Sequence, residues 1–228
     1  MLTISPYNAS IHSVRGACFA WKIPPVMKSW LATAVSLLAC GCSQTGRETK
    51  TTSTQKALEP ITGRQALQYT HGSARFWAPD AQPITVRSMN LDQVKPVDGK
   101  AGAWEIGYVS AQMARARTYT WSAVEIGDSL HKGVFRGPEE AWQGPQGQQR
   151  TFVPEALRID TPQALQTAVA SSSDYLKKPY SKPQVTFLLE ATPRFPNPVW
   201  RVLWGTSVGS AEHAVIVDAV TGVLLSKN

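Results

Sequence analysis

The stretch VWRVLWGTSVGSAEHAVIVDAV, from Val199 to Val220, has a degenerate second copy earlier in the chain. That copy, AWEIGYVSAQMARARTYTWSAV, begins at Ala103 and aligns over 22 residues without a gap, at an offset of 96. Few residues are identical, but the apolar positions coincide, and Trp104 aligns with Trp200. Similarity at a fixed spacing is typical of a repeated supersecondary unit. The sequence therefore predicts two tandem units.

Apolar and polar side chains alternate along both stretches, which predicts antiparallel strands with one buried face. A further apolar strand is predicted ahead of each pair, around Val86 in the first copy and Phe187 in the second. The apolar side chains that share one face are Trp104, Ile106 and Tyr108 in the first copy, and Trp200, Val202 and Trp204 in the second.

A helix is predicted ahead of the strands in each copy. Thr62 and Gln65 fit a capping box, in which each side chain satisfies a free backbone N–H of the first turn. In the second copy Thr161 is the candidate cap, and Pro162 follows where its missing N–H costs nothing. The order helix, strand, strand, strand thus occurs twice. We expect an α+β fold of two helix-plus-antiparallel-sheet units, each with its own sheet.

Composition divides the chain into five segments. Residues 1–39 have the features of a signal peptide, and residues 40–57, polar and rich in Thr and Ser, those of a lipid-anchored flexible tether. The first unit is expected at 58–136 and the second at 151–228. Between them, residues 137–150 have the Gly, Pro and Gln content of a connector.

The predicted signal peptide has a basic start and a short apolar run. Lys28 precedes the run Trp30–Ala39, which is shorter than the roughly 20 apolar residues needed to span a bilayer. This layout is that of a secretory signal. Met27 comes directly before Lys28, as the start of a signal would, so Met27 is a candidate for the true start.

The sequence LLAC, Leu37 to Cys40, resembles the bacterial lipobox, in which the cysteine carries lipid. The resemblance implies attachment at Cys40, with Cys42 as the alternative. It also implies a cell-envelope protein held to a membrane by lipid. Because no aspartate follows Cys40, the expected location in a bacterium with two membranes is the outer membrane, facing the periplasm. No cysteine follows Cys42, so the folded part is expected to have no disulfide.

Asp218 opens the segment DAVTG, and Gly222 closes it. An aspartate at the first turn position accepts backbone N–H bonds, and glycine adopts a positive φ without a Cβ clash. These two residues therefore predict a structural turn between strands.

The ending V-D-A-x-T-G-x-x-L, together with the helix and three strands, resembles the PepSY domain over residues 160–226. Residues 60–136 match in layout, but Ala123–Gly127 replaces the turn. The resemblance implies a helix held against an antiparallel sheet and offers no catalytic residues. It also implies a role in binding or restraining partner proteins, often peptidases.

No constellation of catalytic or metal-binding residues is evident. A triad of Ser207, His213 and Asp218 is disfavoured, because strand alternation sends the histidine and the aspartate to opposite faces and no nucleophile-elbow motif surrounds the serine. His71 and His131 have no partner at ligand spacing. Phosphate-binding loops and dinucleotide fingerprints are absent from the sequence. We therefore expect no enzyme, no metal and no cofactor.

The formal charge of +7 is spread along the chain. Nucleic-acid binding needs a concentrated basic patch, so nucleic acid is not an expected partner.

Candidate partner contacts come from tryptophans and arginines without an evident core role. Trp142 lies in the predicted connector, where the repeat demands no tryptophan, and Trp204 is a second candidate. Arg115 and Arg117 are expected near a hairpin tip, where they could meet anionic groups. The leading hypothesis is a non-catalytic lipid-anchored protein that binds or modulates another envelope protein. The alternative is a protein that binds a glycan or small ligand through exposed tryptophans.

Overall fold

The computed structural model describes residues 59–145, 149–179, 184–205 and 208–228. The predicted signal peptide, the tether up to residue 57, both candidate lipid-carrying cysteines and Ser207 lie outside these residues. Among the described residues, no helix is long and apolar enough to cross a membrane.

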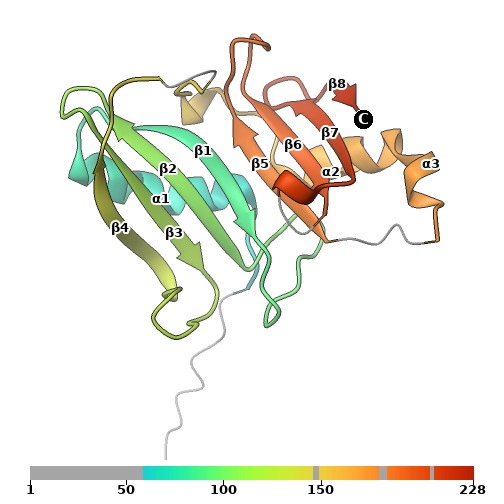
Figure 1. The fold of residues 1–228 in the computed structure, drawn as a ribbon, viewed down its shortest axis with the longest axis horizontal. Helices are drawn as coiled ribbons and strands as arrows, with labels where there is room; N and C mark the ends of the chain where they lie inside the picture. The colour runs from blue at the N-terminus through green and yellow to red at the C-terminus, as the bar shows by residue number, and fades with distance from the viewer. Residues whose placement is uncertain (1–58, 146–148, 180–183, 206–207) are drawn as a thin grey trace, which may run out of the picture. The chain divides into compact units, whose positions relative to one another are not determined.

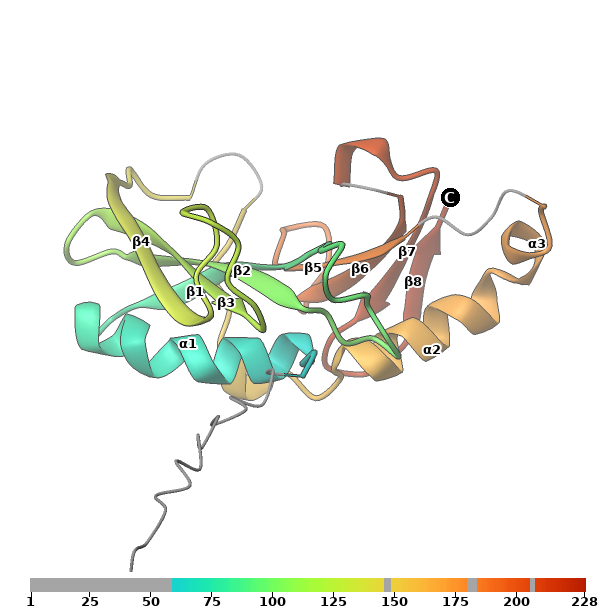
Figure 2. The ribbon, with the colours of Figure 1, turned by 90° about the horizontal axis from the view of Figure 1, so that it is seen from below.

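The described chain forms one antiparallel sheet with its two longer helices on one face (Figures 1 and 2). The first half, residues 59–145, contains α1 (Gly63–Trp77), β1 (Gln82–Met89), β2 (Ala103–Ser110), β3 (Arg115–Ser122) and β4 (Gly133–Ala141). The second half, residues 149–228, contains η1 (Pro154–Ala156), α2 (Thr161–Ser171), α3 (Ser173–Leu176), β5 (Val185–Glu190), β6 (Val199–Trp204), η2 (Val208–Ser210), β7 (His213–Asp218) and β8 (Leu224–Lys227).

The order of strands in the sheet is β4-β3-β2-β1-β5-β6-β7-β8, and every neighbouring pair is antiparallel. The predicted mixture of helix and antiparallel sheet is confirmed. The expectation of a separate sheet in each unit is wrong, because β1 and β5 pair with each other, with Arg87 opposite Leu188. In two separate sheets, one edge of β1 and one edge of β5 would have no partner strand. Pairing these two edges with each other removes both exposed edges.

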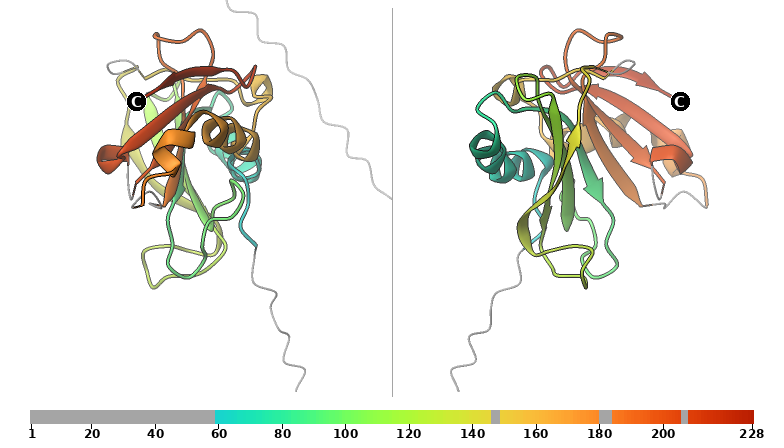
Figure 3. Two further views of the ribbon diagram at one scale, coloured as in Figure 1. Left: turned by 90° about the vertical axis from the view of Figure 1, so that its right-hand side faces the viewer. Right: turned by 60° about the vertical axis from the view of Figure 1, so that its left-hand side comes forward.

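A single hydrophobic cluster spans both halves on the helix-covered face. α1 packs on β1, β2 and β3, and α2 packs on β6, β7 and β8; Figure 3 shows α1 on one side of the strands of its half. Alanines on the buried faces of both helices let them approach the sheet closely. The largest fully buried side chains include Trp104, Tyr108, Tyr119, Phe187 and Trp200.

The helices α1 and α2 begin beside each other and share a cap. The predicted capping box of α1 is confirmed, with Gln65 N–H donating to Thr62 Oγ1 at 3.3 Å and Thr62 N–H donating to Gln65 Oε1 at 3.0 Å. The cap of α2 is Asp160 rather than Thr161. Asp160 Oδ1 accepts the N–H of Thr161 at 2.7 Å and also that of Arg64 in α1, at 3.0 Å. One carboxylate therefore serves the positive ends of two helix dipoles.

The strand β4 crosses the predicted boundary between the first unit and the connector. Gly137 and Pro138 suggested a break, but they form a bulge opposite Thr118, and pairing with β3 continues to Ala141. Proline is tolerated in an edge strand, where its missing N–H need not serve a neighbour. A Cβ on Gly137 would lie 2.8 Å from the carbonyl oxygen of Thr118, so the bulge requires glycine. The first half therefore ends beyond residue 136.

Candidate binding groove

A groove of about 390 Å³ lies between α1 and the edge strand β4, which occupy the same end of the sheet in Figure 2. It forms because α1 packs over β1 to β3, while the helix-facing side of β4 stays partly open to solvent. We call this cavity the α1–β4 groove. It is lined by Gly72, Ser73 and Phe76 of α1, Tyr119 of β3, and Val134 and Arg136 of β4.

The lining of the α1–β4 groove mixes polar and apolar groups, and two of its apolar side chains are exposed. Phe76 is 91% exposed and Val134 is 40% exposed. Exposed apolar side chains that cluster around a concavity mark interaction sites more often than isolated ones do. Among the described residues, Arg136 forms no ion pair, so the groove also presents a free guanidinium group.

Gly72 separates the α1–β4 groove from a second hollow on the other side of α1, of about 360 Å³. A glycine inside a helix costs roughly 0.5–1 kcal/mol relative to alanine. Here a Cβ would meet nothing within 4 Å, so no close approach in the described chain requires the glycine. Its missing side chain lowers the ridge of the helix between the two hollows. A molecule that packs closely against α1 at this position would explain why the residue is glycine.

The second hollow is lined by Arg64, Gln68, His71 and Glu155, with Leu67 and Pro154. Burial lowers the pKa of His71, and Glu155 partly opposes the shift. The buried Nδ1 of His71 has no hydrogen-bond partner among the described residues. Sequence spacing did not identify this histidine, because its neighbours come from the segment that leads into α2.

The outer edge of β4 pairs with no strand among the described residues. At the far end of this strand, Trp142 N–H donates to the carbonyl of Ala114 at 3.0 Å and extends the pairing by one residue. The Trp142 side chain is half-buried. The open edge therefore runs from the groove residues Val134 and Arg136 to Trp142.

The predicted arginine contacts are largely occupied by the fold. Arg117 Nη2 and Trp77 Nε1 both donate to Glu139 Oε2 at 2.8 Å, and the Arg117 guanidinium lies 5.1 Å from the centre of the Trp77 ring. The Arg117 side chain is only 13% exposed, so it is not available to a partner. Arg115, 3.6 Å from Glu139, stays about half exposed. The sequence could not show this arrangement, because Glu139 lies in the segment 137–150, whose composition predicts a connector and not a strand.

Trp204 is also unavailable to a partner, because it is 3% exposed. It faces the helix side of β6, opposite His213 in the register, and packs against Tyr175. Its position in the alternation with Trp200 and Val202 determines its burial.

Asp218 and Gly222 form the predicted turn. Asp218 Oδ1 accepts the backbone N–H groups of Val220 and Thr221, both at 2.8 Å, and Gly222 has φ +78°. Burial would raise the pKa of Asp218, but hydrogen bonds from Asn197, Thr221 and Val220 together lower it. The environment of the Asp218 carboxylate is therefore set by the turn that it closes.

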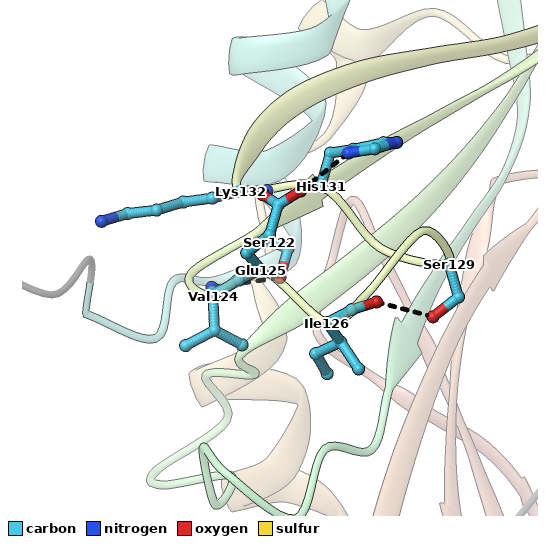
Figure 4. Close-up of polar contacts among 7 residues, drawn as sticks. All are labelled: Ser122, Val124, Glu125, Ile126, Ser129, His131 and Lys132. Atoms are coloured by element: carbon cyan, nitrogen blue, oxygen red, sulfur yellow. Dashed lines mark hydrogen bonds and ion pairs between the residues drawn. The ribbon is translucent and has the colours of Figure 1, made fainter.

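The first half has a related turn built from a different residue. Ser122 occupies the position of Asp218, and its Oγ accepts the N–H of Val124 at 3.2 Å. The longer loop that follows is closed by Glu125, which takes a hydrogen bond from His131 Nδ1 at 2.8 Å and one from Lys132 N–H at 2.6 Å (Figure 4). The sequence predicts that Ala123–Gly127 replaces the turn in this half, but one hydrogen bond of the turn is kept, from Val124 N–H to Ser122 Oγ.

Of the disfavoured triad, His213 and Asp218 are described, whereas Ser207 lies outside the described residues. His213 Nε2 lies 2.8 Å from Ser172 Oγ, and Asp218 is taken up by its own turn. No three His, Cys, Asp or Glu side chains in the described part of the chain could hold a metal ion together.

No family model and no curated protein matches the chain. Among solved structures, the chain is similar to the crystal structure of a protein from Clostridium difficile 630 that is classed provisionally as a lipoprotein. The two share 11% sequence identity, the similarity covers 72% of this chain and 91% of the other, and the TM-score is 0.42. A likeness this distant carries no information about activity or partners.

Proposed function

We propose that this chain is a non-catalytic, lipid-anchored protein of the cell envelope that binds an extended segment of another envelope protein in the α1–β4 groove. The observation that carries the proposal is the conjunction of an open strand edge with the 91% exposed Phe76 beside it. An exposed edge offers backbone hydrogen bonds, and a flanking apolar pocket offers specificity.

The chemistry of the groove indicates what the bound segment contains. An extended chain that pairs along β4 would place alternate side chains in the groove. An apolar side chain would cover Phe76 and Val134. An acidic side chain would pair with the free guanidinium of Arg136. Pro138 cannot donate a hydrogen bond, so the paired stretch is short and lies over the first part of β4.

The anchor belongs to the same proposal. Lipid on Cys40, or on Cys42, would hold the chain at a membrane of the envelope. In a bacterium with two membranes we place it at the outer membrane, facing the periplasm. The repeated order of helix and strands, and the Asp218 turn, support a PepSY-like origin for both halves. Such domains bind partner proteins, which agrees with a groove and no catalytic cluster.

The burial of the tryptophans argues against the alternative of glycan binding through exposed tryptophans. Four tryptophans of the folded part, Trp104, Trp121, Trp200 and Trp204, are buried. Trp77 lies half-buried beneath the guanidinium of Arg117, and Trp142 is half-buried. These rings do not form an exposed stacking platform.

Site-specific photo-crosslinking tests the proposal. A photoreactive residue replaces Val134 in the full-length lipidated chain, and the crosslinked peptide is mapped by mass spectrometry. We expect one envelope protein to be joined through a short segment with apolar and acidic residues. A synthetic peptide of that segment should bind the wild type and lose at least about tenfold in affinity with Phe76→Ser.

Val169→Ser is the matched control, because Val169 is an exposed apolar residue of α2, in the other half. It should bind the peptide as the wild type does. Crosslinks scattered over many proteins, or a peptide that binds equally to Phe76→Ser, would refute the proposal.

A further inference from the structure

Two adjacent hollows lie between α1 and the segment that leads into α2. One is the hollow of about 360 Å³ beside Gly72, and the other has a volume of about 120 Å³. Both are lined by His71, Pro154 and Glu155, so we treat them as one site, the His71 trough. The larger hollow falls within the size range of small-ligand sites, about 300–1,000 Å³.

The His71 trough is separate from the α1–β4 groove. The two cavities share only Gly72 among their lining residues, and Phe76, Val134 and Arg136 belong to the groove alone. A ligand in the trough therefore does not depend on the function proposed for the groove.

One wall of the trough is a stripe of polar side chains on α1. Arg64, Gln68, His71 and Arg75 follow each other at intervals of four, three and four residues, which places them on one side of the helix. All four line the trough. Polar stripes of surface helices usually face open water. Here the stripe faces a second wall across the two hollows.

The second wall is held in place by the fold. Phe152 N–H donates to the carbonyl of Pro83 in β1 at 3.0 Å, and the Phe152 side chain is buried. Leu157 N–H donates to the carbonyl of Pro154 at 3.2 Å, which closes the short helix η1 around Glu155. The backbone that carries the Glu155 carboxylate is therefore fixed opposite α1.

The middle of the trough contains a histidine ring that no hydrogen bond at Nδ1 holds in place. The buried Nδ1 of His71 has no partner within the described chain. A buried polar atom without a partner is costly, so a hydrogen bond to this ring would stabilise the protein. Burial lowers the pKa of His71, so the ring is mostly neutral at pH 7 and offers hydrogen bonds rather than a charge.

Two opposite charges flank the His71 ring without neutralising each other. Arg75 lines the smaller hollow, and Glu155 lines both. Each acts on the ring, since the Glu155 carboxylate raises the pKa of His71 and the Arg75 guanidinium lowers it. Neither Arg75 nor Glu155 forms an ion pair with another described residue. The trough therefore presents one positive and one negative group to a ligand.

We propose that the His71 trough binds a small zwitterion, in which an ammonium group pairs with Glu155 and a carboxylate pairs with Arg75. The neutral His71 ring forms a hydrogen bond to the ligand between the two charges, and an apolar part of the ligand lies on Leu67 and Pro154. A simple anion would be repelled by Glu155 and a simple cation by Arg75. A free amino acid and a dipeptide both have the required chemistry.

The His71 ring supplies the readout. Its side-chain NMR resonances are followed in the folded protein while free leucine is added. We expect a shift that saturates with leucine concentration. N-acetylleucine lacks the ammonium group and leucine amide lacks the carboxylate, so each should bind at least about tenfold more weakly than leucine.

Variants of the two charged residues show whether the shift reports the proposed pairing. Arg75→Gln and Glu155→Gln should each weaken leucine binding at least about tenfold. Both side chains are exposed, so the fold should be kept, and thermal unfolding checks this. Glu155→Gln should not weaken the binding of N-acetylleucine further, because that ligand has no ammonium group to lose.

The matched control is Arg158→Gln, which removes an exposed guanidinium group a few residues away, outside the lining of the trough. It should bind leucine as the wild type does. A weakening as large as that of Arg75→Gln would show a general effect of net charge and would contradict the proposed contact.

A parallel titration with glycylleucine separates the two sources of the zwitterion. Tighter binding than leucine identifies a peptide, and equal or weaker binding identifies a free amino acid. His71 resonances that respond to neither compound would overturn the proposal and leave the trough as a site for water only. N-acetylleucine that binds as tightly as leucine would overturn it as well.

Discussion

Trp104 and Trp200 make the same hydrogen bond in the two halves of the fold. Trp104 Nε1 donates to the carbonyl of Ile61 at 3.0 Å, and Trp200 Nε1 donates to the carbonyl of Ile159 at 3.0 Å. Each carbonyl belongs to the residue just before the cap of the helix in its own half. Both rings are fully buried. The shared geometry supports a repeated unit, with tryptophan fixing the start of the helix in each copy.

Replacing either tryptophan by phenylalanine should destabilise the protein to a similar extent. Trp104→Phe and Trp200→Phe keep an aromatic ring but leave a buried carbonyl without its donor and remove part of the packed volume. We expect a loss of about 1–3 kcal/mol in the free energy of unfolding for each, measured by urea denaturation. A large loss for one and none for the other would argue against equivalent roles.

Two glycines of α1 should respond to alanine in opposite directions. Gly63→Ala would place a Cβ 2.5 Å from Cη2 of Trp200, so we expect a loss of about 1–3 kcal/mol in stability. Gly72→Ala meets no neighbour within 4 Å and should raise stability by about 0.5–1 kcal/mol. Thermal unfolding of both variants gives the signs. A destabilised Gly72→Ala protein would show that the fold itself needs that glycine.

The two related turns should differ in strength. Asp218→Ala removes the acceptor for the N–H groups of Val220 and Thr221 and should cost about 1–3 kcal/mol. Ser122→Ala removes the acceptor of one backbone N–H, so its effect on the free energy of unfolding should be smaller. A larger loss from Ser122→Ala would contradict this assignment.

Stability should fall as the solution is acidified below the ordinary pKa of histidine, about 6.5. The pKa of His213 is lowered in the folded state, chiefly by burial, so the unfolded chain takes up the proton first. The His213 contribution is complete above about pH 6.5, declines as the pH falls toward the folded-state pKa, and then levels off. His71, whose pKa burial also lowers, acts in the same direction.

Urea unfolding in phosphate-free buffer at about pH 7.5 and about pH 5.5 measures this decline. His213→Gln should be less stable overall and should lose less stability between the two pH values. An identical decline in the wild type and in His213→Gln would show that other groups cause it.

The sequence was sufficient to predict the local structure where one residue type has a specific geometric task. Thr62 and Gln65 cap α1 as predicted, and Asp218 and Gly222 make a turn, because these interactions lie within a few residues. The alternation around Trp104 and Trp200 placed both rings in the core for the same reason. Here the side-chain pattern itself carries the information.

Long-range pairing could not be predicted in this way. Nothing in the sequence of β1 or β5 specifies that the two strands pair with each other, so a joined sheet was not expected. The strand β4 was missed because Gly137 and Pro138 resemble turn residues unless the bulge and the edge position are known. The α1–β4 groove was missed for a related reason, since only the packing of α1 beside β4 brings the exposed Phe76 next to Val134 and Arg136.

The most direct test of the proposed groove is Gly72→Leu, measured for affinity toward the peptide identified by crosslinking. Leucine is a better helix former than glycine and has open space at this position, so the fold should be at least as stable as the wild type. The added side chain would stand at the groove and should weaken peptide binding at least about tenfold. A stable Gly72→Leu protein that binds the peptide with wild-type affinity would contradict the proposed site.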